Sequence, residues 1–351
     1  MKRVFTITLM ILLALTSINS LEAQKKARTK KTRRKNVKVV VLDSVFQLKG
    51  LGTADSPFII SNLEDLNQLS KVCQKKHFIT SGKYFKQTRD ISISGTYSVI
   101  GTKDKPFNGN YDGGGYKVVF SNNINFLENN GYFGIFGVNE GEIANIFVSG
   151  EMDVTYNKHN VYVGAIAGLN KKNISQCCNH AKIVAAGNNG SIYLGGIAGR
   201  SDAGKIIDCY NANELFGNSD DSYCGGITGW NSTHSTVENC YSSGEATGYM
   251  VGGTVGMNYG LVKKNYYLTF SRPYYGVNKQ LLGDRSVNVI GNDGGGEVIA
   301  SRSRTIGEMQ SADFALALSE QFKYDKGFPK LVWEKSEKKA IKKKRTTRRR
   351  R

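Results

Sequence analysis

YLGGIAGRS at residues 193–201 and YCGGITGWN at 223–231 are two of five related stretches that decide the fold of this 351-residue chain. The others are YFGIFGVN at 132–139, YVGAIAGLN at 162–170 and MVGGTVGMN at 250–258. Their second shared glycine recurs in steps of 31, 31, 30 and 27 residues, and a further match such as DCY or NCY follows each one. A fixed period with two anchors indicates a repeat array. The structural glycines of this array are Gly134, Gly137, Gly168, Gly196, Gly199, Gly226, Gly229, Gly253 and Gly256.

Each repeat predicts short β-strands. Small or apolar residues alternate with polar ones over short runs, whereas a helix requires a longer stretch with a period of 3.6 residues. One repeat buries too few side chains to offset its ordering entropy of about 1–2 kcal/mol per residue, so repeats have to stack. We therefore expect an all-β solenoid, a right-handed parallel β-helix with repeats of about 30 residues and short capping helices. The glycines would allow successive turns to bend and pack closely.

These repeats resemble the GLUG repeat, a glycine-rich motif of bacterial surface and secreted proteins with the form GG-apolar-apolar-G-x-N, followed by a segment like NCY. The resemblance extends to GLGTADSPFIISNLEDLNQLS at 50–70, to the segments at 84–120 and to the closing segment at 305–333, so it covers most of residues 50–333. It implies a parallel β-helix at or beyond the cell surface, often described as adhesin-like. It implies no particular ligand.

The amino-terminal segment, residues 1–23, has the pattern of a secretory signal peptide. Lys2 and Arg3 precede an apolar run that is too short to span a bilayer, and a small residue, Ala23, marks the expected cleavage point. The first cysteine is Cys73, so no lipid-attachment cysteine lies near that point. We expect a secreted, periplasmic or cell-surface protein without a transmembrane segment after cleavage; an uncleaved anchor is the alternative.

Two basic tails, residues 24–38 and 335–351, hold the positive charge of the chain, whose formal net charge is +19. Such blocks repel themselves and lack apolar residues, which predicts disorder. They would tether the protein to an anionic surface glycan or lipopolysaccharide, or serve merely as solubilising ends. They contain no aromatic side chain for base stacking, so we expect no dedicated nucleic-acid site. The anion-binding candidates are Lys25, Lys26, Arg28, Lys30, Lys31, Arg33, Arg34, Lys35, Lys342, Lys343, Lys344, Arg345, Arg348, Arg349, Arg350 and Arg351.

Capping elements are expected on both sides of the β-helix, which should span residues 81–300 with its GLUG-like repeats at 132–270. Residues 39–80 should supply a strand, over 37–48, and a short helix capped by Ser61 or Asn62. Residues 301–334 should supply a second short helix and a last strand, over 328–333, that close the far end.

Three cysteines, Cys177, Cys209 and Cys240, occupy one position in successive repeats, aligned with Ile146 or Tyr266 elsewhere. An inward stack of small apolar thiols is favoured over a disulfide, although adjacent strands lie close enough for one. Zinc sites usually have Cys-x-x-Cys pairs or partnered histidines, and neither spacing occurs. We expect no metal and no cofactor.

The sequence favours a non-catalytic adhesion or binding module. It lacks a nucleophile elbow, a phosphate-binding loop and a zinc-peptidase motif. Two rows of side chains could face a carbohydrate or protein ligand, or could pack inward and hydrogen-bond their own turns. The alternative function is a polysaccharide-cleaving β-helix enzyme, a lyase or glycoside hydrolase, although Asp202, Asp208, Glu214, Asp220 and Asp221 share no column. The two candidate rows are Tyr210, Tyr241 and Tyr267, and Asn139, Asn170, Asn231 and Asn258.

Overall fold

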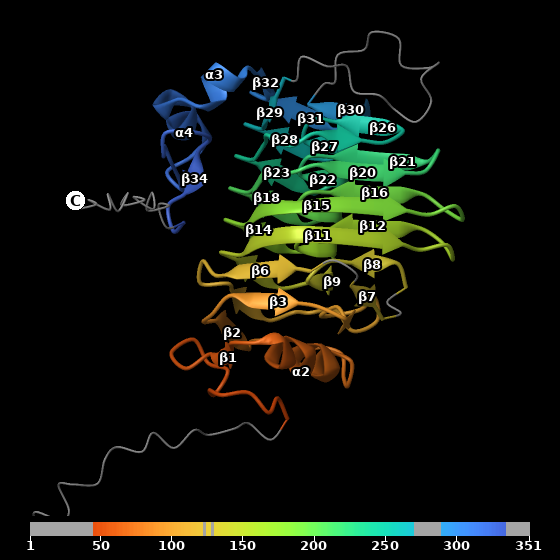
Figure 1. Ribbon diagram of the computed structural model, residues 1–351, viewed down its shortest axis with the longest axis vertical. Helices are drawn as coiled ribbons and strands as arrows, with labels where there is room; N and C mark the ends of the chain where they lie inside the picture. The colour runs from red at the N-terminus through yellow and green to blue at the C-terminus, as the bar shows by residue number, and fades with distance from the viewer. Residues whose placement is uncertain (1–44, 122–123, 128–129, 270–288, 335–351) are drawn as a thin grey trace, which may run out of the picture. The chain divides into compact units, whose positions relative to one another are not determined.

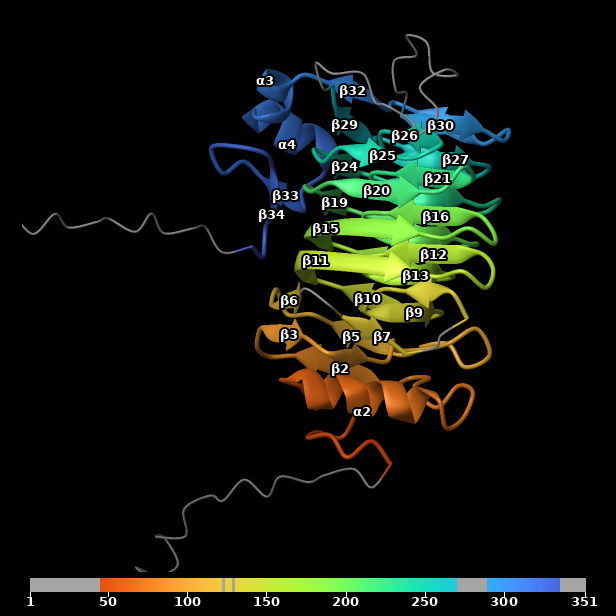
Figure 2. The same cartoon turned by 45° about the vertical axis from the view of Figure 1, so that its right-hand side comes forward.

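The computed structural model describes residues 45–121, 124–127, 130–269 and 289–334, which belong to a compact unit that starts at Leu42. These residues form a right-handed parallel β-helix of about seven turns (Figures 1 and 2). The expected fold class is therefore confirmed. The segment expected to be a signal peptide, both basic tails and all sixteen anion-binding candidates in those tails lie outside the described residues.

Four parallel sheets run along the solenoid, named here in the order in which one turn visits them. The first contains β1 (Phe58–Ile60), β2 (Tyr84–Gln87), β5 (Asn110–Asp112), β10 (Glu142–Ala144), β14 (Asn173–Ser175), β18 (Lys205–Ile207), β23 (Thr236–Glu238), β28 (Leu261–Lys263) and β31 (Glu297–Ile299). The second contains β3 (Ile91–Ile93), β6 (Lys117–Phe120), β11 (Phe147–Thr155), β15 (Cys178–Ala186), β19 (Tyr210–Asn211), β20 (Leu215–Asn218), β24 (Tyr241–Ser242), β25 (Ala246–Thr247), β29 (Tyr266–Leu268) and β32 (Arg302–Arg304).

The five repeat stretches of the sequence supply the remaining two sheets, apart from β30, which comes later in the chain. The third contains β8 (Tyr132–Phe133), β12 (Val161–Gly164), β16 (Ile192–Gly195), β21 (Ser222–Gly225) and β26 (Met250–Gly252). The fourth contains β9 (Phe136–Asn139), β13 (Ala167–Asn170), β17 (Ala198–Ser201), β22 (Thr228–Asn231), β27 (Val255–Asn258) and β30 (Ile290–Asp293). A small additional parallel pair joins β4 (Thr96–Tyr97) to β7 (Asn125–Phe126).

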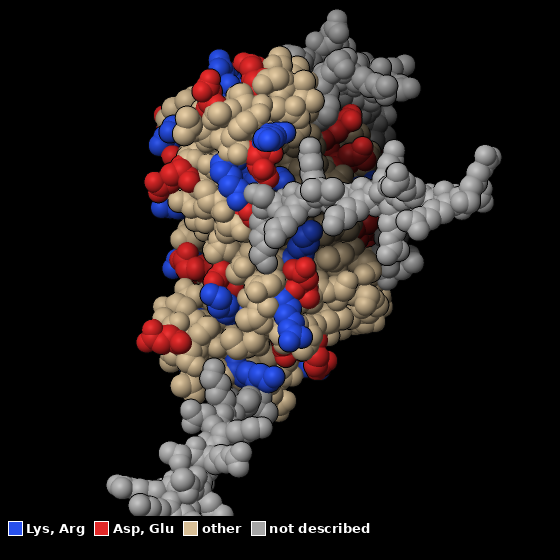
Figure 3. Space-filling view, turned by 60° about the vertical axis from the view of Figure 1, so that its left-hand side comes forward, with Lys and Arg blue, Asp and Glu red and all other residues tan. Residues whose placement is uncertain are grey.

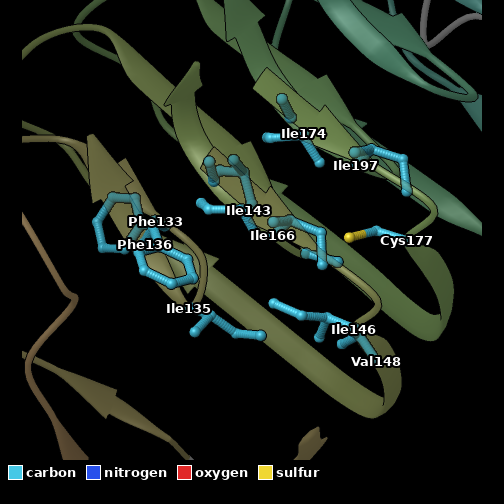
Figure 4. Close-up of a cluster of buried hydrophobic side chains, with 14 of the residues drawn as sticks. Phe133, Ile135, Phe136, Ile143, Ile146, Val148, Ile166, Ile174, Cys177 and Ile197 are labelled. Carbon is cyan, nitrogen blue, oxygen red and sulfur yellow. The ribbon is translucent and has the colours of Figure 1, made fainter. Parts of the chain in front are cut away.

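Columns of equivalent inward side chains build the core. Ile143 pairs in register with Ile174, which pairs with Ile206, and all three are buried. Figure 4 shows Ile166 and Ile197 stacked in the same way across the interior. Because each fully buried aliphatic side chain contributes about 1.5–3 kcal/mol, the stack supplies the stability that a single turn lacks.

A single residue in the left-handed region turns the chain from the first sheet to the second. This corner is Asn145, then Gln176 and Asp208 in the next turns, with φ values of 60°, 50° and 55°. Side chains brace some of these corners, since Asn239 Nδ2 donates to Asp208 Oδ1 at 3.2 Å. Asn and Asp tolerate this backbone conformation better than most residues do.

The repeat glycines lie where consecutive turns approach most closely. A Cβ on Gly226 would stand 2.3 Å from the carbonyl oxygen of Gly253, and one on Gly199 would stand 2.5 Å from the amide nitrogen of Val163. Both distances are shorter than any van der Waals contact, so these positions exclude every larger residue. The predicted role of the glycines in close packing is confirmed.

The asparagine row lies inside the solenoid and does not face a ligand. Asn139, Asn170, Asn231 and Asn258 are completely buried. Asn139 Nδ2 donates to Asn170 Oδ1 at 2.9 Å, and its Oδ1 accepts from the amide of Gly141. The prediction of glycan-facing asparagines is wrong, because these amides hydrogen-bond their own turns and one another.

The thiol column also lies inside, as expected. Cys177, Cys209 and Cys240 are completely buried, and all six cysteines, each within the described residues, are free thiols. Burial raises the pKa of Cys177 and Cys209 well above the usual value. One alignment needs correction, because Asn265 and not Tyr266 continues this column: its Oδ1 accepts from the amide of Cys240.

The amino-terminal cap matches the predicted helix. α2 (Leu63–Cys73) begins after Asn62, whose side chain accepts from the amide of Asp65, and it buries its apolar face next to β1 and β3 (Figure 1). Of the strand expected over 37–48, only residues 45–48 are described; none of these four lies in a strand, and Val45 and Phe46 lie in a turn.

The carboxyl-terminal segment differs from its expected place. It contains α3 (Ile306–Met309), α4 (Ala312–Leu318) and an antiparallel pair of β33 (Phe322–Lys323) and β34 (Lys330–Leu331). Both views show it beside the stack and next to the second sheet (Figures 1 and 2). Its contacts run back along the outer face of that sheet, not across the end of the stack as we expected. We call residues 305–334 the strap.

Candidate functional site

A row of tyrosines on the outer face of the second sheet forms the floor beneath the strap. Cys178 pairs in register with Tyr210, Tyr210 with Tyr241, and Tyr241 with Tyr266. The predicted row contained Tyr267 in place of Tyr266. That one-residue slip matters because neighbouring residues of a strand point to opposite faces: Tyr267 packs in the interior.

The strap covers this tyrosine row. Tyr210 and Tyr241 stack with ring centroids 4.9 Å apart, and Phe314 and Phe322 pack on Tyr241 at 5.8 Å each. Tyr241 also donates its hydroxyl hydrogen to the carbonyl of Pro329. The row faces outward as a ligand-binding row would, but it is buried by the chain itself, so the prediction that it faces a glycan is wrong.

Glu334 fastens the end of the strap to the row. The Tyr210 hydroxyl donates to the Glu334 carboxylate, with oxygen–oxygen distances of 3.0 and 3.1 Å, and lies 2.9 Å from His180 Nε2. The amide of Leu331 donates to Glu334 Oε1 at 2.7 Å. Burial raises the pKa of Glu334 even though these donors oppose the shift, and burial raises the pKa of Tyr210 well above its usual range.

A hollow of about 570 Å³ opens beside this fastening, between the strap and the outer faces of β6, β11 and β15. We call it the strap pocket. It is lined by Arg89, Asp90, Gly115, Tyr116, Lys117, Phe147, His180, Lys330, Trp333 and Glu334.

The strap pocket combines cationic and aromatic groups. Arg89 and Lys117 are exposed, and the Lys117 ammonium lies 4.9 Å from the Phe147 ring centroid, on which His180 stacks at 4.5 Å. Trp333 donates its indole hydrogen to the carbonyl of Gln176 at 3.2 Å, which fixes its ring at the wall. Aromatic faces with a few charged groups are typical of sites that hold polar ligands in a fixed orientation.

Two carboxylates line the strap pocket, and both have structural partners. Asp90 Oδ1 accepts from the amide of Lys117 at 2.9 Å, while Glu334 is engaged by Tyr210 and Leu331. The carboxylates considered from the sequence are not gathered here. Asp208 lies at a corner beneath the strap, where Ser319 donates to it at 2.7 Å, and Asp202 pairs with Arg200 at 3.6 Å.

A second, larger hollow of about 700 Å³ lies on the outer face of the first sheet, around Tyr84 and Lys86. Its lysine is compensated, because Lys86 forms an ion pair with Asp112 at 3.3 Å. Figure 3 shows acidic and basic side chains mixed over the side that it turns forward, which is the side of the strap in Figure 1. The strap pocket is the better candidate for an anionic ligand, because Arg89 and Lys117 line it together, whereas the other hollow is lined by a single cation that is already paired.

The structure contains a second tyrosine row that was not predicted from the sequence. Tyr132, Tyr162, Tyr193 and Tyr223 stack on the third sheet, at 4.8, 4.9 and 5.4 Å between consecutive ring centroids. The signal was present, since a tyrosine opens four of the five repeat stretches. Tyr162 and Tyr223 are partly exposed, so this row reaches the surface where the other one does not.

A cluster of potential metal ligands was also not predicted from the sequence. The ligand atoms of Cys178, His180 and Glu334 all lie within 4.8 Å of one another. The spacing of Cys178 and His180, two residues apart in a strand, places them on one face. Sequence spacing could not supply Glu334, which comes from the strap more than 150 positions later.

No helix among the described residues is long and apolar enough to cross a membrane.

Comparison with known proteins identifies the fold of the chain but does not assign it to a family. No protein-family profile matches the chain, and no curated protein matches it. Among solved structures, it is similar to a crystal structure described as a "putative immunoglobulin A1 protease" from Bacteroides ovatus, with 21% identity and a TM-score of 0.52 over 83% of this chain and 96% of that chain. At this identity the likeness shows a shared fold alone, and the GLUG resemblance stays a hypothesis.

Proposed function

We propose that this protein is a non-catalytic, extracytoplasmic binding module that takes an acidic saccharide into the strap pocket. The observation that carries the proposal is the pocket itself, where Arg89 and Lys117 stand beside the rings of Phe147 and Trp333. A uronic-acid unit would place its carboxylate against the cations and its ring against an aromatic face.

Features of the sequence support the proposed extracytoplasmic location and the proposed retention at an anionic surface. The signal-like segment at residues 1–23 and the resemblance to GLUG repeats favour a secreted or surface-held, adhesin-like protein. The basic tails would hold it at lipopolysaccharide or another polyanion, so weak pocket binding would act together with weak tail binding. Binding through the tails should then weaken more steeply with salt than binding in the pocket, because the tails act through many charges alone, whereas the pocket adds ring contacts to two cations.

Tryptophan fluorescence tests the pocket directly. The chain has two tryptophans, so Trp230→Phe leaves Trp333 as the reporter. Titration with acidic oligosaccharides should shift its emission and titration with neutral oligosaccharides should not. Arg89→Ala with Lys117→Ala should weaken binding at least tenfold, about 1.4 kcal/mol. Lys172→Ala, at an exposed lysine paired with Glu142 on the first sheet, is the matched control.

The outcome separates pocket from tails. If a chain cut to residues 39–334 still binds with the Trp333 response, the pocket carries recognition. If the response never appears, or binding survives the double substitution and vanishes with the tails, the pocket is not the site.

A polysaccharide-cleaving enzyme is the second candidate, and one observation favours it. Asp90 and Glu334 line the same pocket, and burial raises the pKa of Glu334, as is common for a general acid. Product analysis of the same oligosaccharides decides between the two functions. Cleavage that Glu334→Gln abolishes would establish the enzyme, and intact oligosaccharides would support the binding module.

A further inference from the structure

We propose that Cys178, His180 and Glu334 form a site for a divalent ion of the zinc type, which clamps the strap to the solenoid. The proposal concerns a separate ligand, and it stands whether or not the strap pocket binds a saccharide. Nothing in the repeat architecture requires these three residues to meet, because Glu334 comes from the strap and the other two come from β15.

The donor set fits this class of metal. Thiolate, imidazole and carboxylate are the groups that hold Zn²⁺, with bonds of about 2.0–2.3 Å. Three donor atoms that lie within 4.8 Å of one another need shifts of roughly 1 Å or less to reach such distances from one centre. The alternation of β15 assists, since Cys177 and Asn179 point inward while Cys178 and His180 point outward.

Hydrogen bonds from neighbouring groups hold the proposed ligands in place. The Tyr210 hydroxyl, which donates to Glu334 and lies 2.9 Å from His180 Nε2, would keep its bond to the carboxylate as the imidazole turns to the metal. The amide of Leu331 holds the same carboxylate at 2.7 Å. Outer hydrogen bonds of this kind orient the ligands of established metal sites.

The binding step is a simple exchange. Zn²⁺ loses water ligands as it bonds to the sulfur of Cys178, to one nitrogen of His180 and to one oxygen of Glu334. The thiol proton passes to water, and the metal remains divalent throughout. A fourth position stays open toward the strap pocket, because His180 and Glu334 line it. Since the ion bonds to both the strap and β15, it should slow opening of the strap.

Zinc and cobalt titrations of the full chain, freed of metal with a chelator, test the proposal. Competition with a chromophoric chelator should show one Zn²⁺ per chain, and Co²⁺ should give a thiolate charge-transfer band. Cys178→Ser should abolish that band and weaken zinc binding at least tenfold, and Glu334→Gln should weaken binding similarly. Cys224→Ser, at another completely buried thiol, should bind as the unaltered chain does.

Two results would overturn the site. One is a cobalt-treated, unaltered chain that lacks the thiolate band, an outcome that depends on no variant. The other is zinc binding that persists unchanged in both Cys178→Ser and Glu334→Gln. Glu334→Gln keeps the shape of the side chain, so it remains informative if Cys178→Ser fails to fold.

Discussion

Two tyrosine rows built by the same repeat differ in their exposure to solvent. Tyr132, Tyr162, Tyr193 and Tyr223 stack along the third sheet and reach the surface at two positions. Tyr210, Tyr241 and Tyr266 are register partners along the second sheet and are buried. The 4.9 Å between the stacked rings of Tyr210 and Tyr241 is close to the spacing in the other row, because parallel strands set it. The difference is the strap, which supplies Phe314, Phe322 and Leu331 as a cover. A row of outward-facing aromatic side chains therefore indicates a binding face only if no other segment of the chain packs over it.

The largest expected effect comes from opening the covered row. Tyr241→Ala removes a completely buried ring that contacts Tyr210, Phe314 and Phe322, so it should lower the free energy of unfolding by about 3–5 kcal/mol. Tyr223→Ala, in the open row, should cost about 1 kcal/mol. Urea denaturation of both variants measures the contrast, and equal losses would mean that the strap adds nothing to the burial of its row.

Removing single hydroxyl groups sharpens the same contrast. Tyr210→Phe keeps the stacked ring and removes the hydroxyl donor to Glu334, which then accepts only from the amide of Leu331 among the donors described here, so the change should cost about 1–3 kcal/mol. It should also speed amide hydrogen exchange within residues 305–334. Tyr162→Phe, in the open row, should stay within about 0.5 kcal/mol of the unaltered chain. Unchanged exchange in the strap after Tyr210→Phe would contradict the fastening described here.

A smaller gain is expected inside the solenoid, away from both rows. Ser201 interrupts the asparagine ladder between Asn170 and Asn231, and Ser201 Oγ and Asn231 Oδ1 are buried without a hydrogen-bond partner. Ser201→Asn should complete the ladder and stabilise the fold by about 0.5–1.5 kcal/mol, without changing hydrogen exchange in the strap. Ser201→Ala, which also lacks the amide, should show no such gain in thermal unfolding.

The subtlest difference concerns two carboxyl groups, one under the strap and one outside it. Burial raises the pKa of Asp208, so its contribution to stability is complete below pH 3.8, its ordinary pKa, and is lost as the pH rises through the raised value. Burial also acts to raise the pKa of Asp112, but Asn145, Gly114 and Lys86 together outweigh it and lower the pKa. The contribution of Asp112 is therefore present above pH 3.8 and is lost as the pH falls through the lowered value.

Unfolding measured across that pH range, with Asp208→Asn and Asp112→Asn as the references, should give slopes of opposite sign. Asparagine suits position 208, because the residue has a φ of 55° and its side-chain oxygen still accepts from Ser319. Slopes of the same sign would mean that the strap does not govern the environment of Asp208.

Three differences from the sequence analysis have one cause, which is the distance along the chain between the strap and what it covers: the covered tyrosine row, the position of the closing segment and the meeting of Glu334 with Cys178 and His180. The amphipathic helix after Asn62 was predictable because its cap and apolar face are local. For the strap the sequence predicted one short helix, where the structure has two, α3 and α4. Two of its apolar residues do not pack, since Leu316 is 80% exposed and Ile306 56% exposed. No local sequence signal distinguishes a segment that packs across the end of the β-helix from one that packs along its side.

By itself, the sequence determined the solenoid. The glycine period, the alternation of small and polar residues and the inward thiols are fixed by contacts between residues one turn apart, and each turn repeats them. Tertiary structure alone decided the rest. It buried Tyr210, Tyr241 and Tyr266 beneath the strap and brought Glu334 to Cys178 and His180. These outcomes depend on a contact between segments far apart in the chain, which no repeat pattern encodes.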